Sequence, residues 1–140
     1  MHERSAAWSP DGKWIAYLSD QSGEFELYVQ AQDGRSDPVM LSRDADTYLY
    51  SPQWSPDSKR LAWYDRKGRL RTVDLATRTL TLVTQQPVAY PQPFAWSPDS
   101  QWIAWTRSNP RGMAKLMLTH LERNTTIEAS DGWYSVESPK

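Results

Sequence analysis

The sequence predicts an all-β chain made of three copies of one four-stranded antiparallel unit. A hexapeptide recurs in it as WSPDGK, WSPDSK and WSPDSQ, beginning at Trp8, Trp54 and Trp96. The copies begin 46 and then 42 residues apart, a period typical of proteins that repeat one supersecondary unit. No window of a dozen residues keeps apolar positions at helical spacing without an intervening Pro or Gly.

Three predicted strands follow each hexapeptide in the same order. The first covers WIAYLS, RLAWYD or WIAWTR, alternating runs with an Ala in register: Ala16, Ala62 and Ala104. The second covers FELYVQA, RLRTVDL or AKLMLTHL, with a Leu at an equivalent position in each copy: Leu27, Leu70 and Leu116. The third covers PVMLS, TLTLVT or TTIEAS, and the segment leading into the next Trp supplies the fourth strand.

The hexapeptide itself predicts a tight turn between the innermost strand of a unit and the next strand. Pro holds its φ near about −65°, Asp bonds back to nearby backbone N–H groups, and Gly or Ser completes the reversal. A catalytic or ligating role is the weaker interpretation of Asp11, Asp57 and Asp99. One carboxylate per turn forms no paired arrangement of the kind that acid–base chemistry requires.

Four short strands per period match one blade of a β-propeller, so we interpret residues 1–140 as a single propeller segment with blades beginning near Trp8, Trp54 and Trp96. Closed propellers have about four to eight blades, and three blades leave unpaired faces at both ends. We therefore expect a homodimer that closes a six-bladed ring, with a nine-bladed trimer as the alternative.

Composition narrows the function classes further. The 16 basic and 17 acidic residues nearly cancel, so we expect neither a nucleic-acid partner nor a membrane partner. The absence of Cys excludes disulfides and thiolate chemistry. The sequence shows no signal peptide and no apolar stretch of membrane-spanning length, which predicts a soluble chain that is cytoplasmic as given.

No motif predicts catalysis, a cofactor or a metal site. Only His2 and His120 are present, and neither accompanies a nucleophile on a recognised strained turn. The one basic concentration, DRKGRLR from Asp65 to Arg71, places Arg69 and Arg71 on one face of a strand. We interpret it as a charged turn, with an anionic partner as the alternative.

Binding residues are expected on the face opposite the hexapeptide turns, where the other loops of a propeller gather. Aromatic side chains and arginines supply contact area there. The candidates are Tyr48, Tyr50, Arg66, Tyr90, Arg111, Trp133 and Tyr134. The alternative interpretation is that these aromatic side chains hold adjoining blades together.

Three segments carry a family resemblance: AWSPDGKWIAYLSDQSGEFELYVQAQDG, YSPQWSPDSKRLAWYDRKGRLRTVDLATRTLTLVTQ and FAWSPDSQWIAWTRSNPRGMAKLMLTHLERNTTIEASDGWYSVESP. Together they resemble the WD40-like WSPDG repeats in the propellers of tricorn-type serine proteases, and secondarily those of TolB-type propellers and prolyl-oligopeptidase-like enzymes. The resemblance implies a non-catalytic propeller that gates or guides peptides and scaffolds assembly. Serine hydrolysis belongs to separate domains in that family, so no catalytic residue is carried over.

Three alternatives stay open from the sequence. The chain ends where a fourth Trp is expected, one residue past Lys140, which suggests a segment cut from a longer array, either natural or engineered. An engineered self-assembling propeller would have no natural ligand, whereas a TolB-like propeller would bind proteins and imply a periplasmic parent. A catalytic peptidase fragment is the rival from another class.

Overall fold

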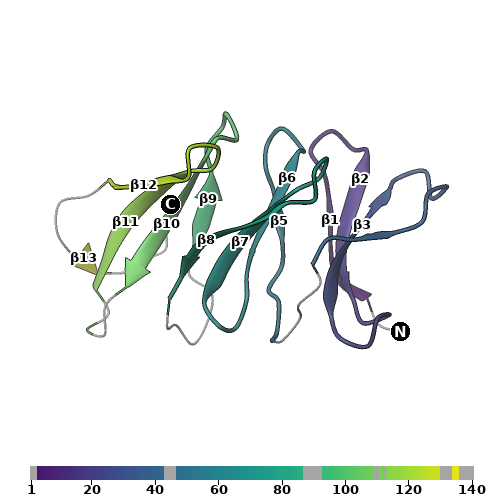
Figure 1. Cartoon of the computed structure of the whole chain (residues 1–140), viewed down its shortest axis with the longest axis horizontal. Helices are drawn as coiled ribbons and strands as arrows, with labels where there is room; N and C mark the ends of the chain where they lie inside the picture. The colour runs from purple at the N-terminus through teal and green to yellow at the C-terminus, as the bar shows by residue number, and fades with distance from the viewer. Residues whose placement is uncertain are drawn as a thin grey trace.

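The computed structural model describes residues 3–42, 47–86, 93–108, 111, 113–129 and 134–135, which form three antiparallel sheets placed side by side (Figure 1). Each sheet is one blade, and its strands pair in chain order. The first blade contains β1 (Glu3–Trp8), β2 (Trp14–Ser19), β3 (Glu26–Ala31) and β4 (Val39–Met40). The second contains β5 (Gln53–Trp54), β6 (Arg60–Tyr64), β7 (Arg69–Asp74) and β8 (Leu80–Gln85).

The third blade contains β9 (Phe94–Trp96), β10 (Trp102–Ser108), β11 (Met113–His120) and β12 (Thr125–Glu128). A short additional strand, β13 (Tyr134–Ser135), also pairs with β11, at Met113 and Ala114. The predicted all-β class is confirmed, since the described residues contain no helix.

Strand register confirms that the three blades repeat one pattern. The three Leu residues that the sequence aligned occupy the same rung: Leu27 pairs with Leu18, Leu70 with Tyr64 and Leu116 with Thr106. The predicted third strand of the first blade is shorter than PVMLS, because Ser42 interrupts the ladder. Its hydroxyl, rather than a backbone carbonyl, accepts the hydrogen bond from the Leu27 N–H at 2.8 Å.

Each hexapeptide forms the predicted turn between the first and second strands of a blade. In the first copy the Ser9 hydroxyl accepts a hydrogen bond from the Trp14 N–H at 3.0 Å and donates one to the Asp11 carboxylate. Asp11 Oδ1 also accepts from the Lys13 N–H at 3.0 Å. The same bonds recur in the other copies, so the Asp side chains fix turns.

These contacts also stabilise the ionised carboxylates. The Ser9 hydroxyl first, and the Lys13 amide second, lower the pKa of Asp11 below its usual value. The Ser97 hydroxyl and then the Gln101 amide lower the pKa of Asp99 in the same way. The arrangement therefore belongs to the turn and requires no external ligand.

The apolar core lies at the joints between blades. One buried cluster joins Leu18, Leu27 and Leu41 of the first blade to Leu61 and Trp63 of the second. A second cluster joins the second blade to the third through residues that include Tyr64, Leu70, Ile103, Trp105 and Met117. Full burial of one such side chain contributes about 1.5–3 kcal/mol, so each blade depends on its neighbours for stability.

Within the described ranges no helix has the length and apolar character needed to cross a membrane.

Candidate binding surfaces

Adjoining blades are joined by the same two hydrogen bonds at each internal joint. The Trp54 indole Nε1 donates to the Ala7 carbonyl at 3.0 Å, and the Trp96 Nε1 donates to the Gln53 carbonyl at 3.3 Å. The second bond links neighbouring hexapeptide turns, with Ser58 Oγ accepting from the Asp11 N–H and Ser100 Oγ from the Asp57 N–H, both at 3.0 Å. We call this pair of bonds the blade lock.

The two outer blades each present one uncovered half of this lock. Trp8 occupies the position of Trp54 in the first blade, yet 60% of its surface is exposed, against 9% for Trp54. Gly12 occupies the position of Ser58 in the same turn. At the other end, Ala95 occupies the position of Ala7 and Gln53 on the third blade.

The side of the third blade that faces away from the second blade carries an apolar row across β9, β10, β11 and β12. The row runs through Ala95, Ala104, Leu118 and Ile127, which are directly paired from strand to strand. Its counterpart in the first blade runs through Ala7, Ala16, Val29 and Val39, and the second blade covers it. Ile127 is 46% exposed, whereas its counterpart Val39 is only partly exposed.

On the face opposite the hexapeptide turns, the structure brings three of the predicted residues together. The Tyr48 and Tyr50 rings meet edge to face with their centroids 5.0 Å apart, and the Arg66 guanidinium lies 5.2 Å from the Tyr48 ring centroid. Arg4 lies between Phe25 and Tyr48, at 4.6 and 4.2 Å from their ring centroids. Its guanidinium also donates to the Tyr48 hydroxyl at 2.9 Å.

This cluster holds the first two blades together, as the alternative interpretation expected for Tyr48. Arg4 belongs to the first blade, and it also donates to the Leu49 carbonyl, which precedes the second blade, at 3.2 Å. Tyr48 nevertheless remains 42% exposed. The sequence does not predict the role of Arg4, because nothing around a single Arg in the first strand indicates that it contacts Tyr48.

Two of the other predicted binding residues, Arg111 and Tyr134, lie on the third blade. Arg111 is exposed in the turn after β10, and Tyr134 lies in β13, paired with Ala114. Tyr90 and Trp133 lie outside the described residues. A role in binding stays a prediction for all seven positions.

The two strand arginines of the basic turn share one carboxylate within their own blade. The buried Asp65 carboxylate forms an ion pair with Arg69 Nε at 2.6 Å and lies 3.9 Å from an Arg71 guanidinium nitrogen. It also accepts hydrogen bonds from the Lys67 and Arg69 N–H groups at 2.9 and 3.1 Å. The charged-turn interpretation therefore accounts for Arg69 and Arg71, because a desolvated carboxylate needs such donors.

A buried polar bridge joins the second and third blades. The Gln86 amide nitrogen donates to the Thr106 carbonyl at 2.8 Å and to the Tyr64 hydroxyl at 3.3 Å, and its oxygen accepts from the Ser108 N–H at 3.1 Å. Burial raises the pKa of Tyr64 to about 12, and the Gln86 hydrogen bond opposes this shift. Nothing in the sequence signals Gln86, because its backbone partners at Thr106 and Ser108 come from another blade.

His120 serves as a structural side chain at the end of β11. Its Nδ1 accepts from the Arg123 N–H at 3.2 Å, and its Nε2 lies 3.2 Å from the Gln101 side-chain oxygen. The first bond places the ring proton on Nε2, which then donates to Gln101. The ring also packs edge to face on Trp102, with centroids 4.8 Å apart. Among the described residues, no group of three or more His, Asp or Glu is placed to hold a metal ion.

Solved structures with the same arrangement of blades include the tricorn protease, with a TM-score of 0.79 and 15% identity over 94% of this chain and 13% of that one. TolB from Acinetobacter baumannii matches with a TM-score of 0.68 and 16% identity, over 96% of this chain and 33% of TolB. The fold is that of a tricorn-like and TolB-like β-propeller. No protein-family profile matches the sequence.

Enzymes also appear among proteins that share this propeller fold. Puromycin hydrolase matches with a TM-score of 0.63 and 23% identity, over 96% of this chain and 22% of the hydrolase. This tricorn-like and TolB-like segment spans less than half the length of each of the three structures. At these identities the likeness concerns the fold alone.

Proposed function

We propose that the chain is a non-catalytic propeller segment that closes a ring with a second copy of itself and offers its loop face to peptides or proteins. The observation that carries this proposal is the blade lock, which is complete at both internal joints and uncovered on the two outer blades. Such a ring would act as a scaffold or a peptide gate.

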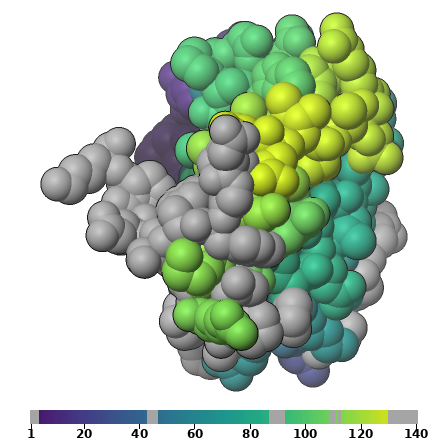
Figure 2. All heavy atoms as spheres, turned by 90° about the vertical axis from the view of Figure 1, so that its left-hand side faces the viewer, coloured from purple at the N-terminus to yellow at the C-terminus, as the bar shows by residue number. Residues whose placement is uncertain are grey.

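The two uncovered faces complement each other. Trp8 offers an indole donor, and the third blade offers the Ala95 carbonyl at the position that accepts this bond in the other joints. Figure 2 looks onto the third blade, where β12 and β11 form much of the visible surface. The apolar row from Ala95 to Ile127 would pack against the outer face of the first blade of the second copy, with Trp8 at the Ala95 end of the row.

A head-to-tail contact of this kind forms a closed ring only if the rotation from blade to blade completes a full turn. Two copies with three blades each give six blades, within the usual range of about four to eight. The joints between copies would keep the Trp hydrogen bond and lack the Ser hydroxyl, because Gly12 replaces it. The assembly joint is thus weaker by one hydrogen bond than an internal joint.

The native mass of the unmodified chain and of three single-residue variants tests this proposal. We expect the unmodified chain to have twice its monomer mass, and Trp8→Ala or Ile127→Glu to have the monomer mass. Leu82→Glu is the matched control, since Leu82 is 49% exposed on the second blade, away from both outer faces. A monomeric unmodified chain, or equal dissociation of the Leu82→Glu control, would overturn the proposal.

Mixing the two disrupted variants tests whether the contact is head to tail. In a mixed dimer, the unaltered third blade of the Trp8→Ala chain meets the unaltered first blade of the Ile127→Glu chain. One of the two joints is then complete, and the other carries both substitutions. We expect mixing to recover dimers that neither variant forms alone. Failure to recover them would contradict a head-to-tail contact.

The non-catalytic part of the proposal rests on His120, whose two ring nitrogens are occupied by Arg123 and Gln101. We expect no turnover of a mixed peptide pool by the purified chain, measured by mass spectrometry. Any turnover would contradict the non-catalytic proposal. If the His120→Gln variant retained that turnover, the active site would lie elsewhere in the chain. If the variant lost it, His120 would have a catalytic rather than a structural role.

A further inference from the structure

The outermost strand of the second blade, β8, differs from its counterparts β4 and β12. It has six residues, and no charged residue occurs from Thr79 to Gln86. In the first blade β4 has two residues and follows Pro38. In the third blade β12 ends at Glu128, which forms an ion pair with Lys115 at 3.4 Å. Short strands, prolines and charges keep the free edge of a sheet from pairing with another chain, and β8 has none of these protections.

Two leucines of β8 expose apolar surface at this edge. Leu80 is 37% exposed and Leu82 is 49% exposed. Leu80 pairs with Val73, which belongs to the cluster that joins the first two blades, so both leucines lie on the face toward the first blade. Thr79 and Thr81 lie on the opposite face of the strand. The edge of β8 therefore has one apolar face and one face of hydroxyl groups.

The backbone groups of the same two leucines point away from β7. The Asp74 N–H donates to the Thr79 carbonyl at 3.1 Å, so Thr79 is bonded toward β7. In an antiparallel ladder such residues alternate with residues whose N–H and C=O point to the other side. Leu80 and Leu82 therefore direct their backbone donors and acceptors to the free edge. The described part of the chain offers these groups no hydrogen-bond partner there.

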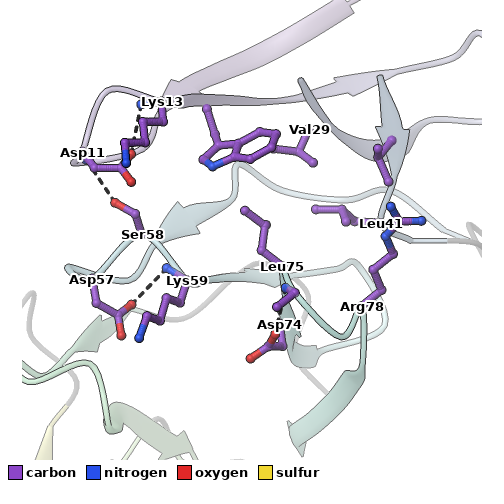
Figure 3. A pocket seen from close by; sticks show the side chains of 13 residues that line it. Asp11, Lys13, Val29, Leu41, Asp57, Ser58, Lys59, Asp74, Leu75 and Arg78 are labelled. Carbon is purple, nitrogen blue, oxygen red and sulfur yellow. Dashed lines mark hydrogen bonds between the residues drawn. The ribbon is translucent and has the colours of Figure 1, made fainter. Parts of the chain in front are cut away.

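The apolar face of β8 belongs to the more open of the two internal joints. A pocket of about 680 Å³ lies between the first two blades, with Trp14 in its wall, and reaches Leu75 in the hairpin before β8 (Figure 3). In the second joint Arg60 takes the position of Trp14. Arg60 forms ion pairs with Asp74 at 3.7 Å and with Glu122 at 3.8 Å, and a space of about 170 Å³ remains. The difference agrees with the exposure of the two leucines on the first-joint side of β8.

We propose that the free edge of β8 binds an extended peptide strand of a partner protein. The N–H and C=O groups of an extended chain are spaced to satisfy those of Leu80 and Leu82. Apolar side chains of the peptide would lie beside the two leucines, and Thr or Ser would lie beside Thr79 and Thr81. The partner strand is thus uncharged where it contacts β8 and alternates apolar with hydroxyl-bearing residues. The edge lies within one chain, so the site does not depend on ring closure.

A second copy of β8 fits this edge less well than a regular peptide. Val83 is an extra residue in the ladder, since Leu82 pairs with Arg71 and Thr84 pairs with Leu70. Such a bulge disrupts pairing locally. In an antiparallel pair of two copies the disruption would occur at both ends, whereas a regular peptide meets it once. The geometry therefore favours a partner strand over self-pairing.

Fluorescence anisotropy with three short labelled peptides tests the proposal. One peptide alternates Leu with Thr, and the second has the same sequence with its Leu nitrogens methylated. The third alternates Lys with Thr, and all three share one solubilising tail. N-methylation keeps the side chains but removes the donors that would face Leu80 and Leu82. We expect the unmodified Leu–Thr peptide to bind at least about tenfold more tightly than either of the others.

Two matched protein variants separate this edge from the ring. Leu82→Glu and Ile127→Glu make the same substitution at similarly exposed positions, 49% and 46%, on the outermost strands of two blades. We expect Leu82→Glu to weaken binding of the Leu–Thr peptide at least about tenfold and to keep its dimer mass. We expect Ile127→Glu to change peptide binding by less than about twofold while it loses the dimer.

Three outcomes would overturn the proposal. The first is equal binding of the methylated and unmethylated peptides, which would show that no backbone ladder forms. The second is an equal loss of peptide binding in Leu82→Glu and Ile127→Glu. The third is a fall in the native mass of Leu82→Glu without peptide, which would assign the edge to a second copy. A chain that binds the peptide as a monomer would refute only the ring.

Discussion

The two internal joints of this molecule share the blade lock but differ in the contacts that surround it. Both have the Trp indole bond to a carbonyl and the Ser hydroxyl bond between turns. The second joint adds the buried bridge from Gln86 and the Arg60 ion pairs, whereas the first adds the exposed Arg4 contact and leaves a pocket. Repeated residues thus set the spacing of blades, and unrepeated ones decide whether a joint is filled or open.

The largest expected effect comes from Gly68→Ala, because Gly68 packs against Gln86, whose side chain bridges the second joint. Gly68 has a φ of +78°, and a Cβ there would lie 1.6 Å from the Gln86 carbonyl oxygen. We expect a loss of more than about 3 kcal/mol in the free energy of unfolding, measured by urea denaturation. Gly12→Ala is the control: its φ of +75° is similar but its surroundings are open, so we expect a loss of about 1 kcal/mol.

Gln86→Leu breaks the buried bridge directly. The Ser108 N–H and the Thr106 carbonyl lose their partner, and an unsatisfied buried group costs about 1–3 kcal/mol. We expect a total loss of about 2–4 kcal/mol in urea denaturation. Arg4→Ala removes the corresponding contact at the first joint and should cost about 1 kcal/mol or less, because that contact is partly exposed. Equal losses in the two variants would contradict the difference between the joints.

Alkaline unfolding sharpens the same contrast through Tyr64. Its folded-state pKa of about 12 exceeds the ordinary value of 10.0, so the folded state holds the phenolic proton more tightly than the unfolded state. The stabilisation is complete below pH 10 and is lost as the pH rises from 10 through 12. We expect a loss of about 2–3 kcal/mol over this range, in order of magnitude, and a smaller loss in Tyr64→Phe. The same pH dependence in both proteins would exclude Tyr64 as its source.

The smallest expected effect concerns the joint between copies. Gly12→Ser would supply the hydroxyl that Ser58 and Ser100 supply at the internal joints, and both of those residues adopt a φ of +64° in the same turn. The closed dimer has two such joints, so two added bonds of about 1 kcal/mol each should strengthen dimerisation by about 2 kcal/mol, or roughly 30-fold in the dissociation constant. Analytical ultracentrifugation of the dimer measures this change, and a weaker dimer would contradict the proposed position of Gly12.

Much of the fold could be predicted from the sequence because its determinants are local. The Ser, Pro and Asp of each hexapeptide act within one turn, and the alternating runs after them pair with their neighbours in the chain. The candidate sites were less predictable. Tyr48, Tyr50 and Arg66 were expected on one face, but the Arg4 contact depends on a pairing across 44 residues of sequence.

The pocket could not be predicted for a related reason. Trp14 and Arg60 are equivalent by register, yet only the neighbouring blade determines whether each of them lines a hollow or fills one. In the sequence, Arg69 and Arg71 likewise have no evident partner within the chain. In the structure, both guanidinium groups lie close to the buried Asp65 carboxylate. Contacts across a joint depend on side-chain direction in two blades at once, and a single repeat pattern does not specify that.

The native mass of the unmodified chain, measured by light scattering over a range of micromolar concentrations, tests the central claim most directly. The proposed pairing of the Trp8 face with the Ile127 face predicts twice the mass of one chain, falling to that of one chain in Trp8→Ala. A single-chain mass at every concentration, with Trp8 still exposed, would contradict it.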